Sequence, residues 1–343
     1  MVLAGGGHTL DVSRAAYHWL EGLTFRDSQW AVYCDEQGRT GGLTVVRCRF
    51  IDNEVGVFLR SRQVRDVYIA DNDFDASSGT WHRQANRKHP YKAVWTNGQG
   101  VDVCYNAVHQ HWDGLSINQP RQGVHEFERK VYAVAFYGND VGQITDDNES
   151  DGGQHNVRFF HNRFVDSHVG LSAQPFYGGP VYFVRNVQYN VTRGLVFKLN
   201  VEPAGVYILH NTSFTSGAVG TNITSGANVH VHNNLFFGCG GPALHAGVLD
   251  PAVSTWDYNG YTASEDVQFK APGERPARSF RELQDKFGYE KHGVEIGFED
   301  LVNVPPPQGE AVVRSPQDFG DYRPRPRSRA VDAGMVLPNI NDG

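Results

Sequence analysis

Short segments in which apolar and polar residues alternate recur along most of the chain. Nine of them can be stacked so that one column holds asparagine in every copy but the first; six of the eight steps between copies are 23 to 25 residues, and two are 33 and 34. A period near 24 residues is too short for a helical repeat and suits one coil of a β-solenoid that contains several short strands. The column holds Cys48, Asn72, Asn106, Asn139, Asn162, Asn186, Asn211, Asn234 and Asn259.

The recurring asparagine has a physical explanation in such a coil. Asparagine tolerates the left-handed conformation of a tight turn, and its amide can hydrogen-bond the equivalent asparagine one coil away. A second column, eight residues later, holds glycine in four copies and opens strands whose alternate residues are apolar. We therefore predict that these alternate residues form the solenoid core. The glycines are Gly56, Gly114, Gly170 and Gly194, and the core residues are Leu115, Ile117, Leu171, Ala173, Leu195 and Phe197.

The neighbours of these core residues are predicted to point to solvent and to form a strip along the solenoid. Strands of adjacent coils lie about 4.8 Å apart, so the strip is continuous and suits an extended polymer. Two insertions, at residues 75–90 and 119–130, flank it. Trp81, Trp112 and Phe176 are further rings able to stack on sugars. The outward pairs are Phe58 and Arg60, Trp95 and Asn97, Ser116 and Asn118, Glu149 and Asp151, Ser172 and Gln174, and Val196 and Lys198.

The asparagine column resembles the right-handed parallel β-helix family of pectate lyases and polygalacturonases, in which an asparagine ladder occupies the turn between the second and third strands of each coil. The resemblance covers about residues 15 to 262. It implies an all-β, single-domain right-handed parallel β-helix of about ten coils over residues 1–262. Residues 263–343 leave the repeat, and we expect a capping tail packed on the solenoid, with a short helix starting near Ser279.

Composition narrows the choice of partners. A net charge of −7 without a basic tract argues against a nucleic-acid partner. No apolar stretch approaches the roughly 20 residues that span a bilayer, so we expect a soluble chain and no membrane partner. The start, MVLAGGGHTL, does not read as a signal peptide. The family resemblance nevertheless implies a secreted or periplasmic protein, and we expect a monomer. Four widely spaced cysteines are predicted to be buried thiols: Cys34, Cys48, Cys104 and Cys239.

Chemistry-bearing residues gather at the entrances of four consecutive strands, which read HWDGLSIN, TDDNESD, SHVGLSAQ and RGLVFKL. The order resembles a polygalacturonase active site. In such a hydrolase one carboxylic acid protonates the leaving oxygen, and another carboxylate activates water. Val196 stands where that family has its substrate-binding arginine, and Val169 separates the histidine from its glycine. The resemblance implies catalytic roles for Asp113, Asp146, Asp147, His168 and Lys198.

The acidic stretch ITDDNESDGG (144–153) also resembles calcium-dependent pectate lyases, which carry such a cluster and a lysine in an F-K-L context on a later strand. Elimination requires the uronate carboxylate to be neutralised, often by Ca²⁺, and a base to remove the adjacent proton. Lys198, beside Arg193, would be the base, with His168 and Tyr177 as alternative proton-transfer groups. The candidate calcium ligands are Asp146, Asp147, Glu149 and Asp151.

Three functions therefore compete. The leading expectation is a lyase that cleaves an acidic, uronate-containing polysaccharide by metal-assisted elimination. The alternatives are an inverting hydrolase and a non-catalytic glycan-binding or structural solenoid. Polar Asn148 and Ser150 at two core positions indicate that function shaped this coil, because buried polar groups must find partners. The candidate substrate-binding residues are Arg60, Trp95, Asn97, Asn118, Gln174, Tyr177 and Arg193.

Overall fold

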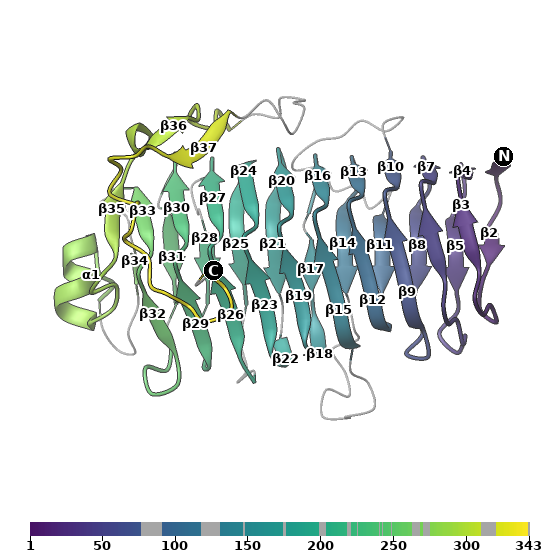
Figure 1. Ribbon diagram of the computed structural model, residues 1–343, viewed down its shortest axis with the longest axis horizontal. Coiled ribbons are helices and arrows are strands. Elements are labelled where there is room, and N and C mark those ends of the chain that lie inside the picture. Colours follow the sequence, from purple (N-terminus) through teal and green to yellow (C-terminus); the bar gives the residue numbers. More distant parts are fainter. Residues whose placement is uncertain are drawn as a thin grey trace.

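The computed structural model describes residues 1–76, 91–117, 131–146, 148–173, 176–198, 204–217, 221–224, 226–239, 241, 243–247, 249–262, 268–269, 275–309 and 320–341. Three long parallel sheets, here called A, B and C, run along one axis (Figure 1). Each coil contributes one strand to each sheet in turn, and strand i pairs with strand i+3 through most of the stack. The predicted parallel β-helix is confirmed, with close to the expected number of coils.

Sheet A contains β1 (Val2–Ala4), β4 (Thr24–Arg26), β7 (Arg49–Ile51), β10 (Asp73–Asp75), β13 (Ala107–His109), β16 (Asp140–Gly142), β20 (Arg163–Val165), β24 (Val187–Val191), β27 (Thr212–Thr215), β30 (Leu235–Gly238), β33 (Gly260–Thr262) and β35 (Val294–Ile296). Sheet B contains β2 (His8–Asp11), β5 (Trp30–Cys34), β8 (Val55–Leu59), β11 (Lys92–Thr96), β14 (Asp113–Ile117), β17 (Glu149–Ser150), β21 (Val169–Ala173), β25 (Arg193–Phe197), β28 (Thr221–Ile223), β31 (Leu244–Ala246) and β34 (Gln268–Phe269).

Sheet C contains β3 (Trp19–Glu21), β6 (Thr44–Val46), β9 (Arg65–Ala70), β12 (Gln99–Cys104), β15 (Val131–Tyr137), β19 (Val157–Phe160), β23 (Val181–Val184), β26 (Val206–Leu209), β29 (Val229–His232) and β32 (Thr255–Asp257). Two short strands, β18 (Gly152–His155) and β22 (Phe176–Gly178), pair at its edge. Parallel pairing already begins at β1 and β2, upstream of the point where the family resemblance starts.

The core lies inside the coils and is built from stacked equivalent residues. The six residues predicted to form it are all fully buried, as are the columns of phenylalanine beside them. Phe25, Phe50 and Phe74 stack in consecutive coils of sheet A, with ring centroids 5.0 and 4.4 Å apart. Three of the four cysteines are buried as predicted, but Cys239, in the segment after β30, is exposed. Cys239 comes directly after the end of β30, outside the strand positions whose side chains alternate into the core.

The asparagine ladder is continuous from Asn72 to Asn259. In each rung the backbone N–H and the side-chain Nδ2 both donate to Oδ1 of the next asparagine, at 2.8 to 3.1 Å. The left-handed residue of each turn is the one before the asparagine, for example Tyr105 (φ 56°) and His161 (φ 54°). The asparagines therefore recur because of their hydrogen bonds and not, as the sequence suggested, because they adopt the left-handed conformation.

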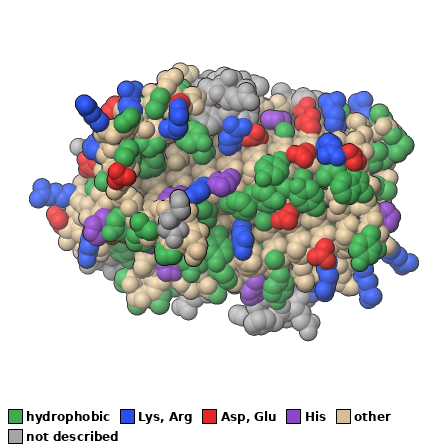
Figure 2. All heavy atoms as spheres, viewed as in Figure 1, with side chains coloured by type: hydrophobic (Ala, Val, Ile, Leu, Met, Phe, Trp, Pro, Cys, Tyr) green, Lys and Arg blue, Asp and Glu red, His purple; other side chains and the backbone are tan. Residues whose placement is uncertain are grey.

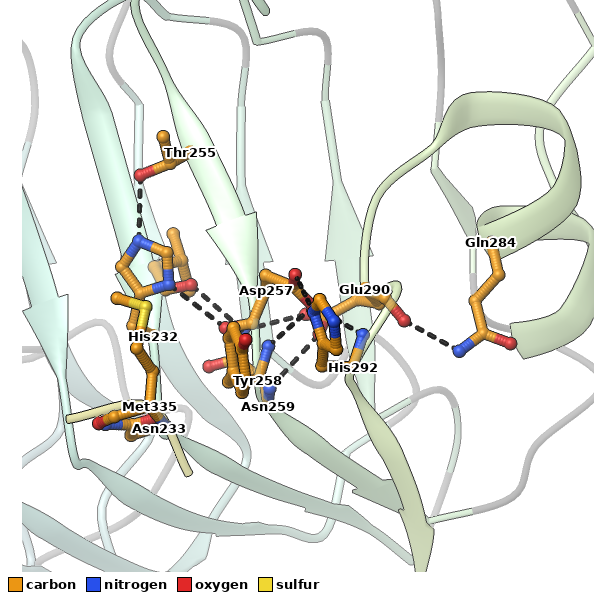
Figure 3. Close-up of polar contacts among 11 residues, drawn as sticks. His232, Asn233, Thr255, Asp257, Tyr258, Asn259, Gln284, Glu290, His292 and Met335 are labelled. Carbon is orange, nitrogen blue, oxygen red and sulfur yellow. Dashed lines mark hydrogen bonds and ion pairs between the residues drawn. The ribbon is translucent and has the colours of Figure 1, made fainter. Parts of the chain in front are cut away.

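A carboxylate ends the ladder. Glu290 accepts from the backbone N–H of Asn259 at 3.1 Å and from its Nδ2 at 2.7 Å (Figure 3). Tyr261 donates its hydroxyl to the same carboxyl group. Gln284 on helix α1 (Phe280–Phe287) donates to the Glu290 carbonyl at 2.7 Å. A carboxyl group is suited to this place because its two oxygens can accept the donors of the last rung.

Replacing Glu290 with glutamine should lower the free energy of unfolding by about 1–3 kcal/mol, because the amide turns a donor toward the N–H groups of Asn259. Burial raises the pKa of Glu290 to about 7, against 4.5 ordinarily. The native state therefore holds this proton more tightly, so the stabilising contribution is full below about 4.5 and is lost as pH rises to about 7. Denaturant titrations of both proteins should show a difference in stability that changes over this pH range; a constant difference would contradict the assignment.

The C-terminal segment packs against the solenoid. The predicted helix is confirmed: Ser279 caps α1 by accepting from the Glu282 N–H at 3.0 Å, and Phe280 and Leu283 join the core of the last coil. Beyond it lie β35, the short helix η2 (Phe298–Asp300) and an antiparallel pair, β36 (Leu301–Asn303) and β37 (Asp321–Pro324). The last described residues turn back along the stack (Figure 1), where Asn233 donates to the Met335 carbonyl. No helix in the described residues is long and apolar enough to cross a membrane.

Candidate functional site

The outer face of sheet B carries the predicted strip in the predicted register, but several of its side chains are buried and not exposed to solvent as predicted, among them Phe58, Ser116 and Glu149. Phe58, Trp95, Ser116, Glu149, Ser172 and Val196 pair in sequence across β8, β11, β14, β17, β21 and β25. The strand starts form a second row, in which Lys92 pairs with Val55 on one side and with Asp113 on the other. The two predicted insertions fall largely within residues 77–90 and 118–130, which lie outside the described residues.

Lys92 is the centre of a buried ionic cluster on this outer face. Its side chain is fully buried, and its ammonium donates to Asp113 Oδ2, to Glu149 Oε2 at 2.9 Å and to Ser116 Oγ at 3.1 Å. The rings of Tyr91 and Trp95 lie 4.8 and 5.0 Å from Nζ, within the range of cation–π attraction. The ammonium of Lys92 on β11 therefore bridges carboxylates from β14 and β17.

Charge and burial shift the proton affinities of this cluster. Burial raises the pKa of Asp113 to about 7 against the opposing attraction of Lys92, and Glu149 raises it further. Burial acts to lower the pKa of Lys92, but Asp113 and Glu149 outweigh it and raise that pKa. The pKa of Asp146 is also raised, first by burial and then by Glu149, while Lys92 and Lys198 oppose the shift. The pKa of Asp113 and that of Asp146 thus both lie above the ordinary value for a carboxyl group.

Some buried polar atoms on this face have no hydrogen-bond partner within the described part of the chain, and three of them surround the ionic cluster. They are Asp113 Oδ1, Trp95 Nε1 and Ser172 Oγ. They come from β14, β11 and β21, so they span the coils around the ionic cluster. Buried polar groups in folded proteins are normally satisfied, and unsatisfied ones often mark functional positions. This face therefore offers acceptor and donor positions to a bound molecule.

Asn148, which directly precedes β17, and Ser150 within it are the two polar residues that the sequence places at core positions. Asn148 is fully buried; its Oδ1 accepts from the Leu115 N–H at 2.9 Å, and its Nδ2 donates to the Gly170 carbonyl at 2.9 Å. The side chain thus supplies bonds to the coils on both sides at a point where β17 is only two residues long. Ser150 is also fully buried, and it too has an interaction partner. The shortened strand β17 therefore lies directly beside the carboxylate cluster.

The structure brings together some of the predicted site residues and separates others. Asp113, Asp146 and Glu149 lie in adjacent coils of sheet B, and Trp95 stacks under Arg60, whose guanidinium carbon is 4.5 Å from the ring centroid. Asn97 and Asp151 follow their strands and are buried. His168 precedes β21, Arg193 opens β25, and Lys198, which is exposed, follows it. Asp147, Asn118 and Gln174 lie outside the described residues.

Tyr177 and Phe176 are placed by their backbone in β22, which pairs with β18 at the edge of sheet C and not within sheet B. Trp81 lies outside the described residues. Trp112, by contrast, adjoins the cluster, because its carbonyl accepts from the Asp146 N–H at 2.8 Å and a hydrogen bond with it lowers the Asp146 pKa. Of the rings proposed for sugar stacking, Trp95 and Trp112 thus border the carboxylates.

The described carboxylates do not fit the predicted calcium site. Among the described residues, no group of three or more His, Cys, Asp and Glu side chains is arranged to hold a metal ion. Glu149 is committed to Lys92, whose ammonium already supplies a cation at this point. Asp147, the remaining predicted ligand, lies outside the described residues. We therefore derive no chemistry through calcium.

Lys92 is a candidate functional residue that the sequence interpretation does not include. Its strand reads KAVWTN and has alanine where the neighbouring strands have glycine, so the strand start was not aligned with the others. The signal was present, since Lys92 precedes Trp95 by the same three positions that separate Asp113 from Ser116 and Asp146 from Glu149. A lysine in the column of two carboxylates indicates an ion pair between coils.

Comparisons with known proteins identify no relative from which the role of the site could be transferred. No protein-family model matches the chain, and no curated protein is significantly similar to it.

Proposed function

We propose that this protein is a polysaccharide-cleaving enzyme that acts by hydrolysis on the outer face of sheet B. The observation that carries the proposal is the fully buried Lys92, held on an outward-facing surface by Asp113 and Glu149. Burying such charges is costly, and a solenoid needs no ion pair there to complete its core. The cost is explained if the cluster sets the protonation of carboxyl groups that act on a substrate.

The two carboxyl groups with raised pKa have complementary positions. Asp146 is partly exposed, so it can reach a glycosidic oxygen and donate a proton to it. Asp113 is buried, and its Oδ1, unpartnered within the described residues, can accept a proton from an attacking water. We assign one shared proton to the two groups as a pair, because they interact and the pKa of each is raised. This is the acid and base pair that glycoside hydrolysis requires.

A lyase remains the second candidate because of Lys198. This lysine is exposed at the end of β25 and is close enough to Asp146 to lower its pKa. In an elimination it would remove the proton beside a uronate carboxylate, and no water would be added. The predicted calcium ligands would belong to this alternative, as would His168 and Tyr177 as proton-transfer groups.

The proposal is tested by incubating the purified protein with acidic and neutral polysaccharides and measuring both reducing ends and the ultraviolet absorbance of unsaturated uronates. New reducing ends without absorbance are expected. Absorbance would support elimination instead, and loss of cleavage on adding a chelator would support the calcium role of Asp146, Asp147, Glu149 and Asp151. No cleavage across the panel would favour a glycan-binding or structural solenoid.

The pH dependence should also separate the two reactions. Hydrolysis needs the proton shared by Asp113 and Asp146, so the rate should fall as the pH rises through about 7, where the pKa of Asp113 lies. A lysine base must first lose its proton, so a lyase should become faster over the same range. Initial rates between about pH 5 and 9 decide this point, and a rate that rises throughout would contradict the hydrolase.

A further inference from the structure

The outer face of sheet B changes character along its length. In one row Tyr33, Phe58 and Trp95 occupy consecutive coils, followed by Ser116, Glu149 and Ser172. The adjacent row contains His8, Trp30, Val55 and Lys92, and Arg193 lies further along the stack. We call Trp30, Tyr33, Phe58 and Trp95 the aromatic half and Arg193 and Lys198 the basic half. The carboxylate cluster lies between them.

The aromatic half is one continuous stacked surface. Trp30 and Tyr33 have ring centroids 5.0 Å apart, Tyr33 and Phe58 are 5.4 Å apart, and Phe58 meets Trp95 edge-on at 5.1 Å. His8 extends the surface to the first coil by stacking on Tyr33 at 3.7 Å. Phe58 is nearly buried, while Trp30, Tyr33 and Trp95 are half-buried and leave ring surface accessible. Figure 2 shows hydrophobic side chains gathered on the viewed face over the N-terminal half of the stack.

The charges around the aromatic half do not favour an anionic ligand. The pKa of Tyr33 is raised by burial and then by Asp35, Asp11 and Glu36, so these carboxylates lie within electrostatic reach of its hydroxyl. The guanidinium of Arg60 is paired with Glu36 at 3.2 Å and lies over Trp95. A sugar bound here would meet ring faces and an acidic surround, which suits an uncharged residue with an apolar face.

The basic half has the opposite preference. Arg193 opens β25 and is half-buried, and Lys198 is exposed just beyond the other end of the same strand. Both lie on the far side of the carboxylate cluster from the aromatic half, two coils beyond β17. A sugar bearing a carboxylate or a sulfate would be attracted to these cations and repelled from the acidic surround of Tyr33.

We infer that the outer face of sheet B takes a mixed glycan in one direction, with an uncharged sugar over the aromatic half and an anionic sugar over the basic half. The inference rests on the proposed function, because it places the bond to be cleaved between the two sugars at the cluster of Asp113, Asp146 and Glu149. Neutral homopolymers and purely acidic homopolymers each satisfy only one half and should bind more weakly.

The test is binding of the Asp146→Asn protein, which leaves ligands intact, to an array of neutral, acidic and mixed oligosaccharides. Mixed oligosaccharides should bind most tightly. Adding Tyr33→Ala should weaken them about tenfold. Adding Arg193→Ala and Lys198→Ala should weaken them, abolish the salt dependence of binding and leave neutral oligosaccharides unaffected. The matched control is Tyr207→Ala, which removes a half-buried tyrosine stacked on Tyr182 at 5.1 Å on sheet C and should change nothing.

Two results would overturn the inference: equal or tighter binding of homopolymers, or full retention of binding by the Tyr33→Ala protein. Absence of binding to every oligosaccharide would overturn it as well. The proposed function fails in a different way. If mixed oligosaccharides bind as expected but the wild-type protein releases no reducing ends from them, the inference about the two halves of the face holds and the proposed hydrolysis does not.

Discussion

Lys92→Met should lower the free energy of unfolding by about 3–5 kcal/mol, the usual cost of removing one partner from a buried ion pair. The substitution leaves Asp113, 2 % exposed, and Glu149, 8 % exposed, without the ammonium that neutralises both. It should also abolish cleavage, because the two carboxyl groups would take up protons and lose their positions. Denaturant unfolding and reducing-end release measure the two effects.

A triple variant separates burial of charge from loss of packing. Lys92→Met combined with Asp113→Asn and Glu149→Gln removes all three charges and keeps similar volumes, so it should recover much of the lost stability while remaining inactive. Equal instability of the single and triple variants would show that the methionine packs badly and that the ionic cluster contributes little. Unchanged stability of the single variant would contradict the cluster as described.

Asp146→Asn should slow cleavage by about 10²- to 10⁴-fold, which is what a positioned acid contributes. Stability should be kept or slightly increased, because Asp146 is partly exposed and its neighbour Glu149 repels its charge. A matched control is Asp102→Asn on sheet C, another carboxyl whose pKa burial raises, which should leave cleavage unchanged. Equal losses in both variants would indicate a general effect on the fold.

The fold was predictable because its cause is local and repeated. Each asparagine makes the same bonds to the next coil, so the period shows which residues stack, and the inward and outward faces then follow from alternation. An interaction that occurs only once, between segments far apart in the chain, produces no repeating pattern in the sequence. Glu290 completes the ladder from outside the repeat, 31 residues after Asn259, and nothing in its own surroundings in the sequence marks it. Cys239 lies outside the columns that the period defines and was wrongly assigned to the interior.

The site was predictable to the same degree. Asp113, Asp146 and Glu149 were found because they interrupt aligned columns, and the structure places them in adjacent coils. Lys92 was missed because its coil departs from the glycine pattern, and Trp30 and Tyr33 were missed because the alignment of outward residues began one coil later. The alternation of apolar and polar residues predicts that side chains such as Glu149 are exposed. The structure buries Glu149 and Asp113, and burial is what raises the pKa of Asp113.

We propose that Asp113 and Asp146 on sheet B catalyse the hydrolysis of a glycosidic bond. The most direct measurement is mass spectrometry of the products formed by the wild-type and Asp146→Asn proteins in water enriched in the heavy isotope of oxygen, using a polysaccharide that the wild type cleaves. The account predicts one heavy oxygen at each new chain end with the wild type and almost no product with the variant. Unsaturated products without heavy oxygen, or equal labelling by both proteins, would contradict it.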